Sequence, residues 1–259
     1  MSEKPPIVVK VGGGALAGGA LEDLPGILAS GRRVAIVHGG GQQLTRMLDL
    51  LGIESRFHEG LRVTDEAALE VAEMVFAGNV NKALARELND LGVPAVGVSG
   101  TDGSTLVVEP IPELGRVGDV VEVKPDLVRA LWDGGFVPVI APLGSGPDGA
   151  YNVNADSAAA ALAVGLGAAH LFLLTDVDGL LAAGEPVDFL APDECEGYVE
   201  SGQAAGGMVP KLRAASMAAH GRVEARILNG NKAGVLAAAI AGEKVGTLIS
   251  GRVATSCKQ

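Results

Sequence analysis

Apolar and polar residues change their spacing repeatedly along the chain, and each change indicates a strand or a helix. Short apolar runs are typical of strands buried on both faces, whereas apolar residues three or four positions apart are typical of amphipathic helices. Buried strands are predicted at 7–9, 33–37, 94–99, 136–141, 170–175, 224–229 and 246–250. Helices are predicted at 20–30, 42–51, 66–78, 79–91, 126–134, 157–166, 212–220 and 232–241. This alternation predicts an α/β fold with a mainly parallel sheet.

The first two strands end directly in glycines, at Gly12–Gly14 and at Gly39–Gly41. Such loops leave backbone N–H groups open to an anion, and the carboxyl ends of neighbouring parallel strands face one crevice. Lys10 lies inside the first apolar run, where it could bind a phosphate or extend to water with equal ease. A dinucleotide fingerprint is disfavoured because no acid ends the second strand, and no Walker A motif is present.

Two later motifs place polar side chains at predicted helix starts. In GLRVTD, Arg62 precedes a helix that Thr64 or Asp65 can cap, and its guanidinium suits a carboxylate or a surface loop equally well. In NVNAD, Asn152 and Asp156 belong to a cluster with more polar groups than capping requires. This favours a functional role, in which the aspartate orients lysines and the asparagine holds a substrate carboxylate or amide.

Three further segments are predicted to border the same crevice. The turn at 176–181 follows a buried strand with two acids and a glycine, which suits a ribose or a metal-bound phosphate. Lys211 follows two glycines at a helix start, where a cation opposes the helix dipole, and this favours contact with a phosphate. The stretch 105–124 alternates apolar and polar residues, which predicts an antiparallel hairpin that covers the crevice as a flap.

Composition narrows the classes of function. The 259 residues are 48% apolar and carry a formal net charge of -11, which argues against binding to nucleic acid or to an anionic membrane. The chain shows no signal peptide and no apolar run long enough to span a bilayer, so a cytoplasmic protein is expected. Two cysteines and four scattered histidines make neither a disulfide framework nor a metal centre.

The motifs VVKVGGG, VHGGG, GLRVTD, NVNAD, LLTDVDG and GGMVPK occur in an order that resembles the amino acid kinase family, most of all its N-acetylglutamate kinase branch. The resemblance implies a three-layer αβα sandwich around an open, mainly parallel sheet. It implies one domain, 1–259, with an acyl-substrate lobe at about 1–150 and a nucleotide lobe at about 151–259. The expected reaction is ATP-dependent phosphorylation of the γ-carboxylate of N-acetyl-L-glutamate in arginine biosynthesis, with Mg²⁺ carried by the nucleotide.

The same resemblance implies a role for individual residues. The phosphoryl group would be stabilised by Lys10 and Lys211, with Asp156 positioning both lysines. N-acetylglutamate would be bound by Gly40, Gly41, Arg62 and Asn152. The nucleotide would be bound by Gly13, Asp176, Val177, Asp178, Gly179, Leu180 and Leu181. By analogy, a homodimer insensitive to arginine is expected, because the first strand starts at residue 7 and leaves no N-terminal helix of the kind that forms hexamers.

The chemistry of the residues agrees with this assignment. A carboxylate acceptor is already ionised at pH 7 and needs no general base, which suits a site rich in lysine and glycine. The nearest alternative is a kinase for aminoadipate or glutamate linked to an acidic carrier protein. The 105–124 segment would repel such a carrier, because it holds Arg116 and Lys124 against four acids. A non-catalytic sensor of amino acids or nucleotides is disfavoured by the presence of both lysines.

Overall fold

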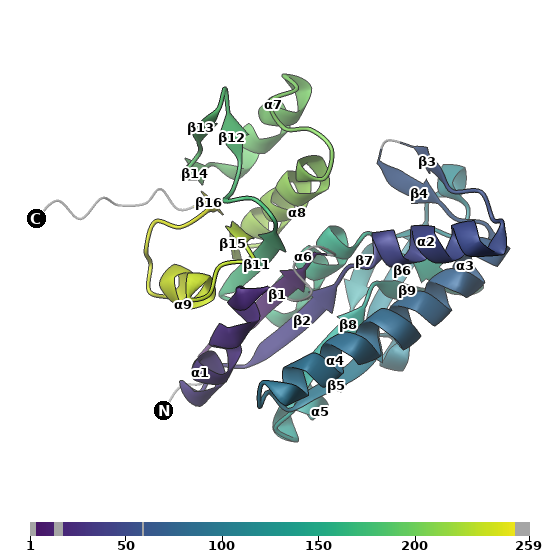
Figure 1. The fold of residues 1–259 in the computed structure, drawn as a ribbon, viewed down its shortest axis with the longest axis horizontal. Helices are drawn as coiled ribbons and strands as arrows, with labels where there is room; N and C mark the ends of the chain where they lie inside the picture. The colour runs from purple at the N-terminus through teal and green to yellow at the C-terminus, as the bar shows by residue number, and fades with distance from the viewer. Residues whose placement is uncertain (1–3, 13–17, 59, 252–259) are drawn as a thin grey trace, which may run out of the picture.

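The computed structural model describes residues 4–12, 18–58 and 60–251, and its centre is one eight-stranded sheet (Figure 1). The strand order is β14-β16-β15-β11-β1-β2-β8-β5, and every pair is parallel except β15 with β16. The strands are β1 (Ile7–Val11), β2 (Val34–His38), β5 (Ala95–Ser99), β8 (Val137–Ala141), β11 (His170–Thr175), β14 (Phe189–Leu190), β15 (Glu224–Asn229) and β16 (Thr247–Ile249). The predicted parallel sheet is therefore confirmed, with β1 and β11 side by side near its middle.

Helices cover both faces of this sheet, as the three-layer prediction requires. One face packs against α1 (Leu24–Ala29), α4 (Asn81–Asp90) and α9 (Val235–Ile240), and the other against α5 (Asp126–Asp133), α6 (Ala155–Leu166) and α8 (Met208–His220). Side chains alternate along each strand, so Val9 packs in the first layer while Val8 packs in the second. Both faces are apolar because neither meets water.

The helices predicted at 66–78 and 79–91 form one continuous run. α3 (Glu66–Glu73) passes into a π-helical turn, η3 (Met74–Val80), which continues directly as α4. The predicted break near Gly78 is wrong, because a single glycine costs a helix only about 1 kcal/mol and does not end it. The run packs with α2 (Gly41–Leu51) around a third apolar core that includes Phe76.

The 105–124 segment is a hairpin, as predicted. Its strands β6 (Leu106–Pro110) and β7 (Gly118–Val123) join β9 (Leu143–Gly146) and β10 (Gly149–Asn152) in a second sheet. This sheet packs so closely on α6 that a Cβ on Gly165 would lie 2.6 Å from the Cβ of Val123. Its alternating apolar residues therefore face a helix and form part of the core. Val117, in the connection between β6 and β7, lines the pocket beside Lys10, so a flap over the crevice stays a prediction.

Smaller elements complete the described chain. They are the strands β3 (Arg56–His58), β4 (Leu61–Val63), β12 (Leu181–Ala182) and β13 (Glu185–Pro186), the helix α7 (Cys195–Glu200), and the 3-10 turns η2 (Gly19–Asp23), η4 (Asp102–Ser104), η5 (Pro112–Leu114) and η6 (Pro192–Glu194). Hairpin β3–β4 stands beside α2 in Figure 1. Within the described residues, no helix has the length and apolar character needed to cross a bilayer.

Candidate active site

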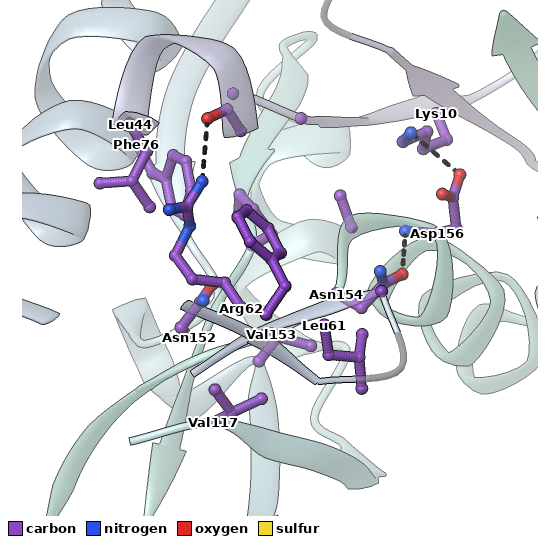
Figure 2. Close-up of a pocket in the computed structure, with 17 residues that line it drawn as sticks. Lys10, Leu44, Leu61, Arg62, Phe76, Val117, Asn152, Val153, Asn154 and Asp156 are labelled. Atoms are coloured by element: carbon purple, nitrogen blue, oxygen red, sulfur yellow. Dashed lines mark hydrogen bonds and ion pairs between the residues drawn. The ribbon is translucent and has the colours of Figure 1, made fainter. Parts of the chain in front are cut away.

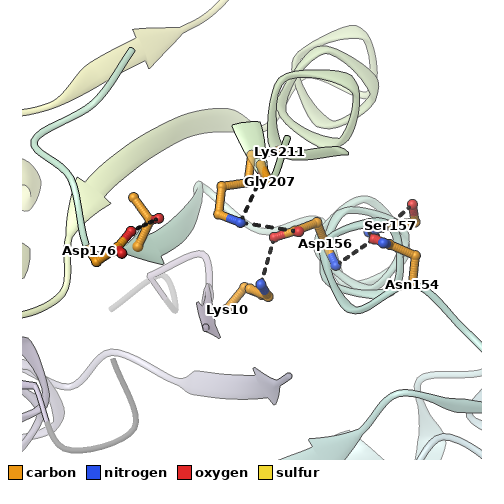
Figure 3. A network of polar contacts seen from close by, with 8 residues as sticks. Lys10, Asn154, Asp156, Ser157, Asp176, Gly207 and Lys211 are labelled. Atoms are coloured by element: carbon orange, nitrogen blue, oxygen red, sulfur yellow. Dashed lines mark hydrogen bonds and ion pairs between the residues drawn. The ribbon is translucent and has the colours of Figure 1, made fainter. Parts of the chain in front are cut away.

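A buried aspartate at the start of α6 contacts two lysines that are far apart in the sequence. Lys10 follows Val8 by two positions on β1, so its side chain leaves the sheet on the α6 face. Its Nζ lies 2.9 Å from Oδ1 of Asp156. Lys211 lies in the first turn of α8, which begins four residues earlier than predicted, and its Nζ lies 3.5 Å from Oδ2 of the same carboxylate. Figure 3 shows the two ammonium groups approaching Asp156 from different elements.

The cap of α6 fixes the direction of this aspartate. The side chain of Asn154 accepts hydrogen bonds from the backbone N–H groups of Asp156 and Ser157 at 3.0 and 3.1 Å. Asn154 is therefore the N-cap, and Asp156 is free to extend toward the lysines. Lys211 also donates to the carbonyl of Gly207 at 3.2 Å, which holds its ammonium group above the first turn of α8.

Burial and charge compete in this cluster. Lys10, Asp156 and Lys211 are at most 9% exposed. Burial raises the pKa of the Asp156 carboxyl, but the two ammonium groups outweigh it and hold the pKa below its ordinary value. Burial and the charge of Lys10 lower the pKa of Lys211, and Asp156 opposes them. Two ammonium groups share one carboxylate, so the cluster favours the binding of a further anion.

A pocket of about 240 Å³ opens beside Lys10 and Asp156 (Figure 2). The four residues predicted to bind the acyl substrate all line it: Gly40, Gly41, Arg62 and Asn152. Figure 2 shows Arg62 on one side of the pocket and Lys10 on the other. Apolar side chains that include Leu44, Phe76 and Val153 complete the wall, so the pocket suits a small molecule with a charged group at each end.

The glycine loop forms one edge of this pocket. The N–H of Gly39 donates to the carbonyl of Val11 at 2.8 Å, which ties the loop to the end of β1. A Cβ on Gly40 would lie 2.9 Å from the ring of Phe76, so this position requires glycine. Among the described residues no side chain caps α2, so the N–H groups of its first turn are open to an anion.

Arg62 joins the hairpin β3–β4 to α2 while it lines the pocket. Its guanidinium donates to the hydroxyls of Ser55 and Thr45, both at 2.6 Å, and lies 4.6 Å from the ring centre of Phe57. Burial lowers its pKa and Asp49 raises it, but an arginine keeps its charge in proteins. On the neighbouring wall, Asn152 donates to the hydroxyl of Thr64 at 3.1 Å.

The turn predicted to bind the nucleotide follows β11. Asp178 accepts a hydrogen bond from Asn229 at 2.7 Å and pairs with Lys232 at 2.8 Å. The N–H of Leu180 donates to the hydroxyl of Thr247 at 2.8 Å, and the Leu180 side chain is buried in the core. Asp176 is close enough to Lys211 to raise its pKa, so the turn lies on the Lys211 side of the cluster. Gly13 lies outside the described residues.

The sequence profile of the amino acid kinase family matches residues 5–229 of the chain. The chain belongs to the amino acid kinase family. An acetylglutamate kinase from Rubrobacter xylanophilus is 70% identical over 94% of this chain and 96% of its own length. One from Methanopyrus kandleri is 46% identical over 82% of this chain and 89% of its own length. The crystal structure of smu.665 from Streptococcus mutans UA159 superimposes with a TM-score of 0.85 at 26% identity, covering 95% and 98% of the two chains.

Several residues of this amino acid kinase site were missing from the sequence prediction. The sequence left open which of the three polar residues of NVNAD caps the helix, because asparagine and aspartate are both preferred N-caps, and the structure assigns this role to Asn154. Phe57, Phe76 and Val117 also line the pocket, and no local pattern indicated this.

In the described part of this amino acid kinase, no three His, Cys, Asp or Glu side chains lie close enough together to hold a metal ion.

Proposed function

We propose that this protein transfers the γ-phosphoryl group of ATP to the γ-carboxylate of N-acetyl-L-glutamate, giving N-acetyl-L-glutamyl 5-phosphate in arginine biosynthesis. The relatives named acetylglutamate kinase support this proposal, because they align with nearly the whole chain. The observation that carries it is the contact of Lys10 and Lys211 with one buried carboxylate, at the edge of a pocket that also contains Arg62.

The pocket suits the acceptor molecule. We assign the α-carboxylate of N-acetylglutamate to the side lined by Arg62 and Asn152, and the γ-carboxylate to the side lined by Lys10. The glycine loop also reaches the Arg62 side, because Arg62 donates to the carbonyl of Gly41 at 3.3 Å. The γ-carboxylate is ionised at neutral pH and attacks without a general base. The site therefore has to align the attacking carboxylate oxygen with the γ-phosphorus of ATP, and to reduce the repulsion between this carboxylate and the phosphates of the donor.

The donor is assigned to the carboxyl ends of β11 and β15. The turn at 176–181 would contact the nucleotide, and the acyl-substrate lobe (about 1–150) would meet the nucleotide lobe (about 151–259) between β1 and β11, which are neighbours in one sheet. Lys10 then approaches the transferred phosphoryl group from the acceptor side and Lys211 from the donor side. Asp156 holds both ammonium groups, and its lowered pKa keeps it from taking up a proton itself.

The donor set of the site fits a magnesium ion that arrives with ATP. Ammonium and backbone N–H groups bind phosphate oxygens, and Asp156, which is paired with two lysines, is not free to ligate a metal. Phosphate oxygens are ordinary ligands of Mg²⁺ in kinases. When bound, the ion neutralises part of the phosphate charge, while the lysines stabilise the charge that develops during transfer.

The two other readings of the sequence are less well supported. A carrier-linked substrate needs a basic surface at the pocket, but Arg116 is paired with Glu66 at 2.6 Å and with Asp148 at 2.7 Å. A non-catalytic sensor would not require two lysines on one carboxylate.

The homodimer and the cytoplasmic location expected from the resemblance belong to this proposal as well, and sedimentation of the purified protein would test the dimer.

A substrate panel tests the reaction. ADP release should depend on N-acetyl-L-glutamate, and trapping with hydroxylamine should detect its acyl phosphate, while glutamate, aspartate and carrier-linked glutamate give little product.

Lys10→Ala and Lys211→Ala should lower kcat much more than they raise the KM for N-acetylglutamate, and Arg62→Ala should mainly raise that KM. An unchanged kcat in both lysine variants would remove these residues from the chemistry.

A further inference from the structure

A buried histidine that the mechanism does not use lies directly before the glycine loop. His38 is the last residue of β2 and has no exposed surface. It does not line the substrate pocket, although Gly39, Gly40 and Gly41 all do. A histidine in this position is therefore neither a base nor a ligand for the substrate. Its role depends on the contacts that its two ring nitrogens make inside the protein.

The contacts of the ring determine its protonation. Nδ1 of His38 lies 2.6 Å from the carbonyl oxygen of Gly39, and a carbonyl can only accept a hydrogen bond. Nε2 lies 3.1 Å from Nδ2 of Asn81, which can only donate. The proton therefore resides on Nδ1, and Nε2 is the acceptor. The amide orientation of Asn81 is itself fixed, because the two hydrogens of Nδ2 are shared among Nε2 of His38 and the carbonyls of Val98 and Val139, which lie at 3.1 and 2.8 Å and can only accept.

The surroundings of the ring keep it neutral. Burial lowers the pKa of His38 to about 4, although the bond to Gly39 raises it, and the positive charges of Lys10 and Lys82 lower it further. Lys82 is held near the ring by hydrogen bonds to Oδ1 of Asn81 at 3.1 Å and to the carbonyl of Gly97 at 2.6 Å. At neutral pH the imidazole is an uncharged group with one donor and one acceptor, both engaged inside the protein.

The bond to Gly39 sets the direction of the peptide unit that follows. In a trans peptide the C=O and the next N–H point in opposite directions. Because the carbonyl of Gly39 faces the ring of His38, the N–H of Gly40 points away from it. Gly40 lines the pocket, and Phe76 lies so close that a Cβ built on Gly40 would be 2.9 Å from its ring.

We propose that His38 is a positioning residue, which acts through the Gly39–Gly40 peptide to present the Gly40 N–H to the carboxylate of the bound acceptor. Asn81, on the first turn of α4, supports the ring from behind and so connects the glycine loop to the long helical run. This inference rests on the proposed function, because it assigns the acceptor to this pocket.

The kinetic test compares three variants. His38→Leu keeps an apolar side chain of similar size but loses the donor to Gly39, and we expect the KM for N-acetylglutamate to rise about tenfold, the value of one hydrogen bond to a charged group. The KM for ATP should stay within about twofold. His38→Asn places an amide N–H near the position of Nδ1 and should recover most of the loss. Leu88→Ala, a core change in α4 that does not touch the pocket, should lower thermal stability without raising the KM for N-acetylglutamate.

A spectroscopic test uses the unmodified protein. In protein labelled with ¹⁵N-histidine, the His38 signal is the one of four that is absent in His38→Asn. It should show a protonated Nδ1 and an unprotonated Nε2, and it should not titrate between about pH 5 and pH 8. A proton on Nε2, a titration in this range, or a His38→Leu variant with wild-type KM for N-acetylglutamate would overturn the inference. If the wild-type protein releases no ADP with N-acetylglutamate, the proposed function fails, and the tautomer is still decided by the spectrum.

Discussion

Replacing Asp156 by asparagine should remove the group that holds both lysines while it preserves the shape of the side chain. With an effective dielectric constant of about 20, an ammonium at 2.9 Å is attracted by about 6 kcal/mol and one at 3.5 Å by about 5 kcal/mol. Most of this attraction offsets the dehydration of the three charges. Breaking a buried ion pair by removing one partner costs about 3–5 kcal/mol, and this is the expected loss of unfolding free energy for Asp156→Asn.

The dependence on pH separates this effect from a general packing defect. The pKa of Asp156 lies below its ordinary value in the folded protein, so its contribution is complete above the unfolded-state pKa of about 4 and is lost as the pH falls through the lowered folded-state pKa. The difference in stability between wild type and Asp156→Asn should therefore be constant from about pH 5 to pH 8 and should shrink below about pH 4.

Urea unfolding followed by circular dichroism measures both quantities. Asp133→Asn is a matched control, because Asp133 pairs with Arg33 at 2.9 Å but is 67% exposed, and its loss should cost less than about 1 kcal/mol. In the same preparations, kcat of Asp156→Asn should fall by roughly 10² to 10³, since the lysines lose their fixed positions. A destabilisation equal to that of the control, or one that does not change at acid pH, would refute the reasoning.

Two other contacts lead to smaller effects. Asp23 accepts hydrogen bonds from the N–H groups of Gly234, Leu236 and Ala237 at 2.9–3.1 Å, so Asp23→Ala should cost about 1–2 kcal/mol in thermal or urea unfolding and leave kcat unchanged; a lower kcat at full stability would contradict a purely structural role. Thr247→Val removes the hydroxyl that accepts from the Leu180 N–H, and should raise the KM for ATP about threefold while the KM for N-acetylglutamate stays the same. An unchanged KM for ATP would separate this contact from nucleotide binding.

Candidate site residues could be named from the sequence at positions where a residue type has few possible roles. Glycines at strand ends expose backbone N–H groups, so the loop at 39–41 could be named as a candidate anion site without coordinates. Lys10 within its strand suited a phosphate or water equally well, and only the family resemblance favoured the phosphate. The strand pattern was equally informative, because parallel strands buried on both faces are apolar throughout.

Features that depend on tertiary packing could not be predicted in this way. The alternation at 105–124 correctly indicates a hairpin, but only the contact with Gly165 of α6 shows that its apolar face is part of the core. Gly78 is compatible with a helix end or a helix interior, and the packing of the π-helical turn against Gly40 decides between them. The role of Phe76 in the pocket follows from the same packing and has no local signal.

The proposal that Lys10 and Lys211 act on a single phosphoryl group is tested most directly by a double-mutant cycle. The rate constant kcat is measured for wild type, Lys10→Ala, Lys211→Ala and the double variant. Because both ammonium groups share Asp156, the loss of one should displace the other, and the double variant should be little slower than the slower single variant. This corresponds to a coupling energy above about 1 kcal/mol. Losses that add within about 0.5 kcal/mol would mean that the lysines act independently, and would contradict the account.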